Sequence, residues 1–562
     1  MKSIIEKYVL KNAVDFGGKA NSNAVLGRIL GEHPELKKDV PKLMKEIQLV
    51  IKTVALLSPE DQRKKLSQVD PALLKEKKEV KEKTLELPHV KGNVVLRFAP
   101  SPSGPLHIGH AYVLALNAEL ARKYNGKLIL RIEDTNPENI YDKAYSMIPE
   151  DAEWLTKGAV SEVVIQSDRL EHYYQTAQQL VDGAHAYVCT CTADKFKELL
   201  SAAKPCPCRN LPVKQQHERY DQMFGKYKPG DAVLRLKTDI NDKNPAMRDF
   251  ALMRINDFKH PRQKTKHKVW PLMNLAVAVD DHLLNVTHTL RGKDHIDNEK
   301  RQRKIADALG WTMPVALYVG KINFTDIRLK TSQIKKEILE KKYNGWDDIR
   351  LPFLRSLKRR GYTPDAFCSY AVDVGITETD KKVTRQEFFK SVNHFNKEIL
   401  DPQANRYFFV AEPIKIKVVG APAREVALHL HPDFHARGVR KFKVHEDFVI
   451  ARKDFEALEQ KKVHRLMDCL NFVVDKKKML FHSLEYDKFK NAENKGMIIH
   501  WLSSMEKLID CTVLMEDNVK VKGKAEHHIA QLSEGAVVQF ERQFFARLDK
   551  KGKKYEFWFT HR

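Results

Sequence analysis

The stretch "RFAPSPSGPLHIGHAYV", residues 97–113, follows directly on the apolar run "NVVL" and decides how this part of the chain folds. Its three prolines prevent a strand from continuing, because proline lacks the backbone N–H that a sheet requires. Gly104 allows the tight turn that must come before a helix. The stretch therefore predicts a strand that ends abruptly, followed by a helix that begins near His107.

The flanking segments extend this pattern into a β-α-β unit. "PLHIGHAYVLALNAELARKYN" has helical apolar spacing, and "GKLILRIEDT" is a second short apolar strand. A strand, a crossover helix and another strand indicate a parallel sheet. Helical patterns follow at 142–157 and 168–184, and strand and helix patterns resume at 269–295. We expect an α/β domain interrupted by an insertion.

Composition narrows the class of protein. A chain of 562 residues is too long for one core, which predicts about three to five domains. Lysine and arginine total 98 against 74 acidic residues, a net charge of +24 that favours a polyanionic partner such as nucleic acid. The alternative explanation of this charge is a basic surface that only keeps the protein soluble. No apolar run of about 18 residues occurs and the start lacks a signal-peptide core, so we expect a cytoplasmic protein without a membrane partner.

The two ends of the chain differ in their periodicity. Residues 1 to about 85 space their apolar residues as helices do, with Ser58 as a helix cap. This part ends in the charge-rich "LLKEKKEVKEKTLEL", which predicts a solvated helix or a linker. A helical region is expected over roughly 331–395, and residues beyond 400 are rich in strand patterns.

His107 and His110 are three residues apart at the start of the predicted helix, so they share one face. A helix N-terminus carries free N–H groups and positive potential that suit phosphates, and two imidazoles can add hydrogen bonds there. Gly109 leaves room for a flat ligand. A proline-rich turn with two surface histidines is the plainer reading of the same pattern.

Four of the seven cysteines form two Cys-x-Cys pairs: Cys189, Cys191, Cys206 and Cys208. Four thiolates from two such pairs suit tetrahedral zinc in a structural role. Four incidental cysteines remain the alternative. An odd number of cysteines argues against a framework of disulfides.

"PLHIGH" after the first strand of a parallel sheet resembles the nucleotide-binding signature of class I aminoacyl-tRNA synthetases. Extended to "RFAPSPSGPLHIGHA" and "LRIEDTNP", it resembles the glutamyl/glutaminyl subgroup. "LRSLKRRGYTPDAF" and "NKEILDPQANRYFFV" are similar to later landmarks of that subgroup. The β-rich C-terminal third and the helical N-terminal extension are similar to its archaeal and eukaryotic form.

This resemblance implies a domain plan. It consists of an N-terminal helical extension (1–92), a Rossmann-type catalytic domain (93–185 and 266–330), an inserted acceptor-binding domain with zinc knuckles (186–265), a helical stem-contact region (331–400) and C-terminal β-barrels that bind the anticodon (401–562). Two roles are open for residues 1–92: they either dock a partner or simply pack against the rest of the protein. We expect a monomer.

The resemblance also implies the reaction, in which ATP with Mg²⁺ activates an amino acid that is then transferred to tRNA. Catalysis is assigned to His107, His110 and Lys330. The residues implied at ATP are Pro100, Ser101, Gly104, His107, Gly109, His110, Lys330 and Ser332. Those implied at the amino acid are Arg97, Ala99, Ser101, Glu133, Met273, Asn274 and Arg291.

Arg291 decides the amino acid that we expect. Glutamyl enzymes carry an arginine at this position of "LRGKDH", where it can pair with the γ-carboxylate, and glutaminyl enzymes typically carry a residue that is not basic. A carboxylate buried without such a partner bears a desolvation cost of several kcal/mol. Met273 stands where the subgroup usually has a substrate-facing tyrosine, so Trp270 or Asn274 is left to help orient the substrate.

A second, lysine-rich loop closes over ATP in class I enzymes, and "LKTSQIKK", residues 329–336, resembles it. Lys330 and Ser332 fit the pattern, but Gln333 stands where the second lysine is expected. Glutamine can donate a hydrogen bond to a phosphate but cannot neutralise its charge. Either Lys335 or Lys336 takes over that role, or the reaction is slower.

The sequence thus predicts an enzyme that ligates glutamate to tRNA, with tRNA(Glu) as partner. Whether tRNA(Gln) is also charged stays open. A glutaminyl enzyme and a catalytically silent tRNA-binding paralogue are the alternatives, the latter supported only by Gln333. A small nucleotidyltransferase with the same histidine motif fits neither the long β-rich C-terminus nor the net charge of +24.

Overall fold

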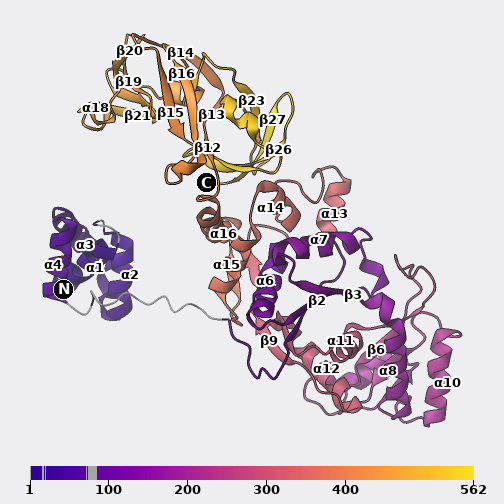
Figure 1. Ribbon diagram of the computed structural model, residues 1–562. Coiled ribbons are helices and arrows are strands. Elements are labelled where there is room, and N and C mark those ends of the chain that lie inside the picture. The colour runs from indigo at the N-terminus through magenta and orange to yellow at the C-terminus, as the bar shows by residue number, and fades with distance from the viewer. Residues whose placement is uncertain (1, 16–17, 19, 71–72, 74–84, 477) are drawn as a thin grey trace. The chain divides into compact units, whose positions relative to one another are not determined.

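The computed structural model describes every residue except 1, 16–17, 19, 71–72, 74–84 and 477. The chain divides into two compact units, Met1–Lys83 and Thr84–Arg562, which are described separately (Figure 1). Most of the predicted helix or linker "LLKEKKEVKEKTLEL" lies outside the described residues. Its last apolar residues, Leu85 and Leu87, pack in the core of the second unit, so the second unit begins before residue 93.

The first unit is a small helical bundle. Its core is formed by apolar residues from every helix, including Ile5, Ile29 and Ile47. Ser58 caps the last helix as expected, accepting a hydrogen bond from the Asp61 N–H at 3.1 Å. The helices are α1 (Lys2–Asp15), α2 (Ser22–Glu32), α3 (Val40–Ala55) and α4 (Pro59–Val69).

The second unit begins with the predicted β-α-β unit. The three strands are parallel in the order β1-β2-β3, with Leu96 opposite Leu128 and Leu130 opposite Val163. This confirms the parallel sheet. The elements are β1 (Val95–Phe98), α6 (Ile108–Lys123), β2 (Lys127–Ile132), α7 (Ala144–Thr156), β3 (Val160–Ile165) and α8 (Leu170–Asp182).

A second pair of parallel strands lies beside this sheet. β8 and β9 pair with Leu290 opposite Leu317, and the Thr287 N–H donates to the Val95 oxygen at 2.9 Å. The start of β8 is therefore held against β1, although 192 residues separate them in sequence. The elements are α11 (Met273–Leu283), β8 (His288–Gly292), α12 (Ile296–Leu309) and β9 (Val315–Val319).

Residues between α8 and α11 form a separate antiparallel sheet of four strands in the order β4-β5-β6-β7. Its core includes Val188, Leu234 and Trp270. All three strand pairs are antiparallel, and none of these strands pairs with the parallel sheet, so the insertion forms a sheet of its own. The elements are β4 (Ala186–Cys189), α9 (Ala193–Ser201), α10 (Val213–Phe224), β5 (Val233–Leu236), β6 (Ala251–Ile255) and β7 (Val269–Pro271).

The region after β9 is mostly helical, and α15 packs on α6 (Figure 1). One element departs from the expected helical region: β11 pairs in parallel with β10, with Asn323 opposite Lys382. Its partner lies 59 residues upstream, a distance that local periodicity cannot reveal. The elements are β10 (Ile322–Phe324), α13 (Thr331–Leu339), α14 (Leu354–Arg360), α15 (Pro364–Val374), β11 (Lys381–Val383) and α16 (Arg385–Leu400).

The C-terminal third confirms the expected barrel-like β structure. Two seven-stranded sheets have the orders β12-β25-β26-β27-β23-β24-β13 and β21-β18-β19-β20-β14-β17-β22, and β15 pairs with β16. The first half holds β12 (Arg406–Tyr407), β13 (Phe409–Ala411), β14 (Pro413–Val419), β15 (Arg424–His429), β16 (Val439–Val444), β17 (Asp447–Ala451), α17 (Arg452–Glu456), β18 (Val463–Leu466), β19 (Leu470–Asp475) and β20 (Lys478–Ser483). The second half holds α18 (Tyr486–Lys490), β21 (Lys495–Ile499), β22 (Leu502–Ser503), β23 (Ile509–Leu514), β24 (Lys520–Ala525), β25 (Val537–Phe540), β26 (Phe544–Lys550) and β27 (Tyr555–His561).

Arg360 joins the helices of the second unit to the last strand. It ends α14, is almost fully buried, and donates to the backbone oxygens of Phe559 at 3.1 Å and Thr560 at 2.8 Å. Among the described residues, no helix is both long enough and apolar enough to cross a membrane.

Candidate active site

A cavity of about 690 Å³ opens where β1 and β2 end and β8 approaches its end. Nine residues predicted from the sequence line it: Arg97, Ala99, Pro100, Ser101, Gly109, His110, Glu133, Met273 and Arg291. Five other predicted residues are not in its lining: Gly104, His107, Asn274, Lys330 and Ser332. The cavity therefore brings together predicted residues up to 194 positions apart, because the ends of adjacent strands meet at one edge of the sheet.

The strand ends explain how the charged side chains reach this cavity. Arg97 is the third residue of β1, and Glu133 follows β2 directly. The Glu133 N–H donates to the Pro100 oxygen at 3.0 Å, which ties the segment after β2 to the proline-rich turn. The prolines thus end β1 and also provide the carbonyl that holds its neighbour.

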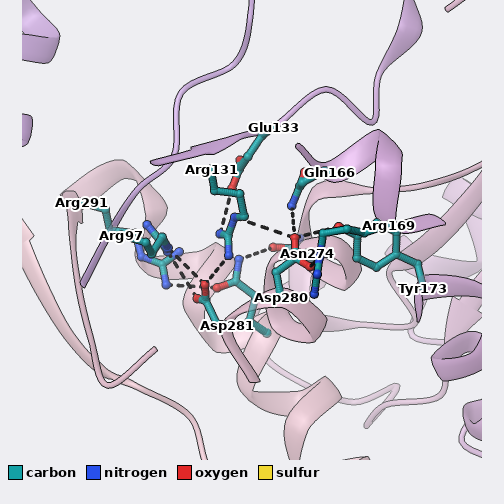
Figure 2. Close-up of polar contacts among 11 residues, drawn as sticks. Arg97, Arg131, Glu133, Gln166, Arg169, Tyr173, Asn274, Asp280, Asp281 and Arg291 are labelled. Carbon is teal, nitrogen blue, oxygen red and sulfur yellow. Dashed lines mark hydrogen bonds and ion pairs between the residues drawn. The ribbon is translucent and has the colours of Figure 1, made fainter. Parts of the chain in front are cut away.

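Asp281 is a fully buried carboxylate between two arginines (Figure 2). Arg97 donates to its two oxygens at 3.2 and 3.4 Å, and Arg131 donates to Oδ1 at 2.6 Å. Burial by itself would raise the pKa of Asp281, but the two guanidinium groups outweigh it and lower the pKa to about 2. Asp281 therefore stays ionised and fixes both arginines.

The neighbouring Asp280 extends the network toward α8. It accepts hydrogen bonds from Gln166 at 3.0 Å, Arg169 at 2.8 Å and Tyr173 at 2.7 Å (Figure 2). Arg131 in turn donates to Glu133 at 3.0 Å, so the cavity carboxylate is held by a side chain with no exposed surface.

The sequence prediction missed Asp280, Asp281 and Arg131. Two signals were available: a pair of aspartates inside the apolar helix "LAVAVDDHLL", and an arginine inside the apolar strand "LILRIE". Buried charges of this kind occur when they are paired with one another. The local pattern does not show which charge pairs with which.

Arg291 lies in the same cavity with a different kind of partner. Its Nη2 donates to the Gln302 amide oxygen at 3.1 Å, and no carboxylate of the described residues lies within 4.0 Å of its guanidinium. Burial lowers the pKa of Arg291 to about 10, and the repulsion from Arg97 adds to the shift. Arg291 is thus a nearly buried cation that has no direct ion-pair partner among the described residues.

The two histidines stack at the start of α6. Their ring centroids are 3.8 Å apart, and His107 caps the helix by accepting from the Gly109 N–H at 3.1 Å through Nδ1. His110 Nδ1 accepts from the His107 N–H at 3.4 Å. Burial lowers the pKa of both rings, that of His110 to about 4. Each neutral ring therefore carries its proton on Nε2, as a hydrogen-bond donor.

Packing inside the protein also requires glycine at position 109, in addition to the room that it leaves for a ligand. A Cβ at this position would lie 2.9 Å and 3.0 Å from two atoms of the His107 ring, and 3.4 Å from Leu329 Cδ1. Gly104 is tighter still, since a Cβ there would lie 2.2 Å from Thr331 Cγ2. The lysine-rich segment 329–336 therefore packs directly on the proline-rich turn.

The side chains of this segment point to several partners. Lys330 is exposed and precedes α13. Gln333 donates to Glu337 at 3.1 Å, and the Lys335 Nζ lies 4.8 Å from the centroid of the Tyr141 ring. Lys336 lies 3.8 Å from Glu340. Both candidates for the missing second lysine are thus engaged away from the cavity.

The four predicted cysteines meet in the inserted domain. Their Sγ atoms lie within 4.8 Å of one another, with Cys206 at 3.5 Å from Cys189 and 3.4 Å from Cys191. Gln216 joins the two pairs: its Oε1 accepts from the Val188 N–H at 2.9 Å and its Nε2 donates to the Cys208 oxygen at 2.7 Å.

A parallel sheet whose first crossover helix begins with His-x-x-His beside such a cavity is the arrangement expected of a class I tRNA synthetase. Residues 93–402 match the family described as tRNA synthetases class I (E and Q), catalytic domain. Residues 404–486 and 476–549 match the two anticodon-binding domains of the same family. The chain belongs to this family.

Two curated relatives cover the chain completely and are themselves covered completely. A glutamate–tRNA ligase of Methanococcus maripaludis is 42% identical over 566 residues, and one of Methanothermobacter marburgensis is 40% identical over 563 residues. A crystal structure of a glutamate tRNA ligase from Elizabethkingia meningosepticum is 18% identical, covers 56% of this chain and 70% of its own, and has a TM-score of 0.41.

Proposed function

We propose that this chain is a glutamate–tRNA ligase that uses ATP to join glutamate to the 3′ end of tRNA. The full-length relatives with that name support the reaction. The observation in the structure that carries the choice of glutamate is Arg291, a cation in the cavity with an amide rather than a carboxylate as its partner.

The charges of the cavity fit this substrate. Asp281 is placed between Arg97 and Arg131, and Glu133 is bound to Arg131, so Arg291 remains as the excess positive charge. Glutamate carries one more negative charge than glutamine, and its γ-carboxylate can pair with this arginine. Glu133 provides an acceptor for the α-ammonium group.

The reaction needs positioning rather than a covalent nucleophile. The α-carboxylate of glutamate attacks the α-phosphate of ATP, pyrophosphate leaves, and a ribose hydroxyl of the terminal adenosine of tRNA then attacks the activated carbonyl. His110, in the cavity, and His107, stacked on it, donate Nε2–H hydrogen bonds to the phosphates, and Gly109 lets them approach. Lys330 stabilises the departing pyrophosphate when its segment closes. Mg²⁺ accompanies ATP.

We propose that the four cysteines hold a structural zinc ion. Tetrahedral zinc with Zn–S distances near 2.3 Å requires sulfurs about 3.8 Å apart, and the cluster approaches this spacing. Four cysteines fill every position of such a site, so the metal would stiffen the inserted domain, residues 186–265, where we place binding of the tRNA acceptor end.

Replacing Cys206 with serine tests the metal. We expect zinc content to fall from about one ion per chain to near zero, measured by elemental analysis, because a tetrahedral site loses a thiolate. The KM for tRNA should rise while the KM values for ATP and glutamate stay unchanged. Cys511→Ser, in a buried cysteine outside the cluster, should keep the zinc. A wild-type protein purified without bound zinc would contradict the assignment.

Charging of tRNA tests the proposed reaction directly. Unfractionated archaeal tRNA is incubated with the full chain, ATP, Mg²⁺ and labelled glutamate or labelled glutamine. We expect glutamate alone to become attached, which would also show that Gln333 is tolerated in the segment 329–336. Attachment to tRNA(Glu) and tRNA(Gln) is then compared with the purified species.

Two results would contradict the proposal. Attachment of glutamine alone would keep the family but reverse the specificity assigned to Arg291. No charging with either amino acid, in a folded protein that still binds tRNA, would favour a silent tRNA-binding role.

A further inference from the structure

Gln302 lies behind Arg291 and has no exposed surface. It belongs to α12, and both ends of its amide are used: Oε1 accepts from Arg291 Nη2 at 3.1 Å, and Nε2 donates to Asn274 Oδ1 at 3.2 Å. Because a guanidinium group can only donate hydrogen bonds, the Gln302 oxygen must face Arg291, and the NH₂ group is left for Asn274. Asn274 therefore anchors the end of the amide that points away from Arg291.

The choice of an amide has an electrostatic consequence. A glutamate in the place of Gln302 would hold Arg291 equally well but would neutralise it. The substrate would then meet an ion pair instead of a cation. An amide oxygen directs the guanidinium while leaving its charge for the ligand. Arg97 lines the same cavity but is treated differently, because it is paired with the carboxylate of Asp281.

We propose that Gln302 is a positioning residue that preserves the selectivity of Arg291 for glutamate over glutamine, because it orients the guanidinium without a negative charge. It holds Arg291 in place without giving its charge a counter-ion, and Asn274 anchors the other end of the amide. The proposal rests on the proposed role of Arg291 at the γ-carboxylate. It assigns Asn274, predicted from the sequence to contact the amino acid, to the support of Gln302.

Three variants separate this role from simple packing. Gln302→Glu keeps the size of the side chain and adds a negative charge beside Arg291. Gln302→Met keeps most of the volume but removes both hydrogen bonds. Asn274→Ala acts from a half-buried position, removes the acceptor of the Gln302 NH₂ group so that the amide is held at one end only, and leaves the fully buried residue untouched. Lys300→Gln, on the exposed side of α12, is the matched control because it lowers the net charge by the same one unit.

The readouts are KM, kcat and the ratio of kcat/KM for glutamate to that for glutamine, in aminoacylation by the full chain. For Gln302→Glu we expect the KM for glutamate to rise about 100-fold and the ratio to fall by a similar factor, since the cation is neutralised. For Gln302→Met and Asn274→Ala we expect the KM to rise about 10-fold with the ratio changed less than about 3-fold. The KM for ATP should stay unchanged throughout, and Lys300→Gln should behave as wild type.

Equal effects of Gln302→Glu and Gln302→Met, with the selectivity ratio unchanged, would show that Gln302 only fills space and would overturn the proposal. An Arg291→Met variant distinguishes the two levels of inference. If Arg291→Met raises the KM for glutamate and Gln302→Glu does not, only the role of Gln302 is wrong. If Arg291→Met leaves the KM unchanged, the proposed role of Arg291 fails and this proposal fails with it.

Discussion

The two sides of the cavity treat buried arginines in opposite ways. On the β1 and β2 side, Arg97 and Arg131 meet the ionised Asp281. On the β8 side, the one side-chain hydrogen bond that Arg291 makes within the described part of the chain is to the amide of Gln302. The first arrangement is complete without a ligand, whereas the second leaves a charge that a ligand must compensate. The difference indicates which arginine is left without a carboxylate partner and is therefore kept for a charged ligand.

Of the two substitutions Asp281→Asn and Arg291→Met, Asp281→Asn should have the larger effect on stability. It leaves two buried guanidinium groups without their shared carboxylate, and breaking a buried pair of this kind lowers the free energy of unfolding by about 3–5 kcal/mol. Unfolding in urea, followed by tryptophan fluorescence, measures the change. A loss below about 1 kcal/mol would show that the arginines are held by other contacts.

The pH dependence of this effect has a definite sign. Because the pKa of Asp281 is about 2 in the folded protein, below its usual value of 3.8, its ionised form stabilises the fold. About 2 kcal/mol of that stabilisation is fully present above about pH 5 and is lost as the pH falls toward 2. The difference between wild type and Asp281→Asn should therefore shrink between pH 5 and pH 3. A difference that grows on acidification would contradict the assignment.

Arg291→Met should act on stability in the other direction, and by less. Its removal relieves the burial of an uncompensated cation, so we expect the free energy of unfolding to stay the same or rise by about 1 kcal/mol. Charging with glutamate should be lost in the same protein. Urea unfolding of the variant beside wild type gives the comparison. A destabilisation equal to that of Asp281→Asn would mean that Arg291 supports the fold as well.

Much of the fold followed from local pattern. The prolines and glycine of residues 97–113 end β1 and start α6, and apolar periodicity gives the parallel sheet. The nine predicted residues that line the cavity lie at the ends of these elements or in the adjoining segments. The strand ends and the helix cap themselves depend on a few neighbouring residues, whereas the roles of the nine residues came from the resemblance to the synthetase family.

What the sequence did not provide were the partners of those residues. Asp281 and Gln302 reach the cavity from helices whose packing is set by the whole domain, and their types alone give no pairing. β11 is similar, since its strand conformation depends on pairing with a distant β10. These features depend on tertiary contacts, which local periodicity does not encode.

The contact between Gly104 and Thr331 restricts how the enzyme can be altered. Any Cβ at position 104 would overlap Thr331. The residue types allowed at the two positions are therefore coupled, although the positions are 227 residues apart in sequence. A mutant library that varies Gly104 alone should yield mostly inactive clones. Varying both together, with compensating sizes, opens the sequence space in which the segment 329–336 can be redesigned.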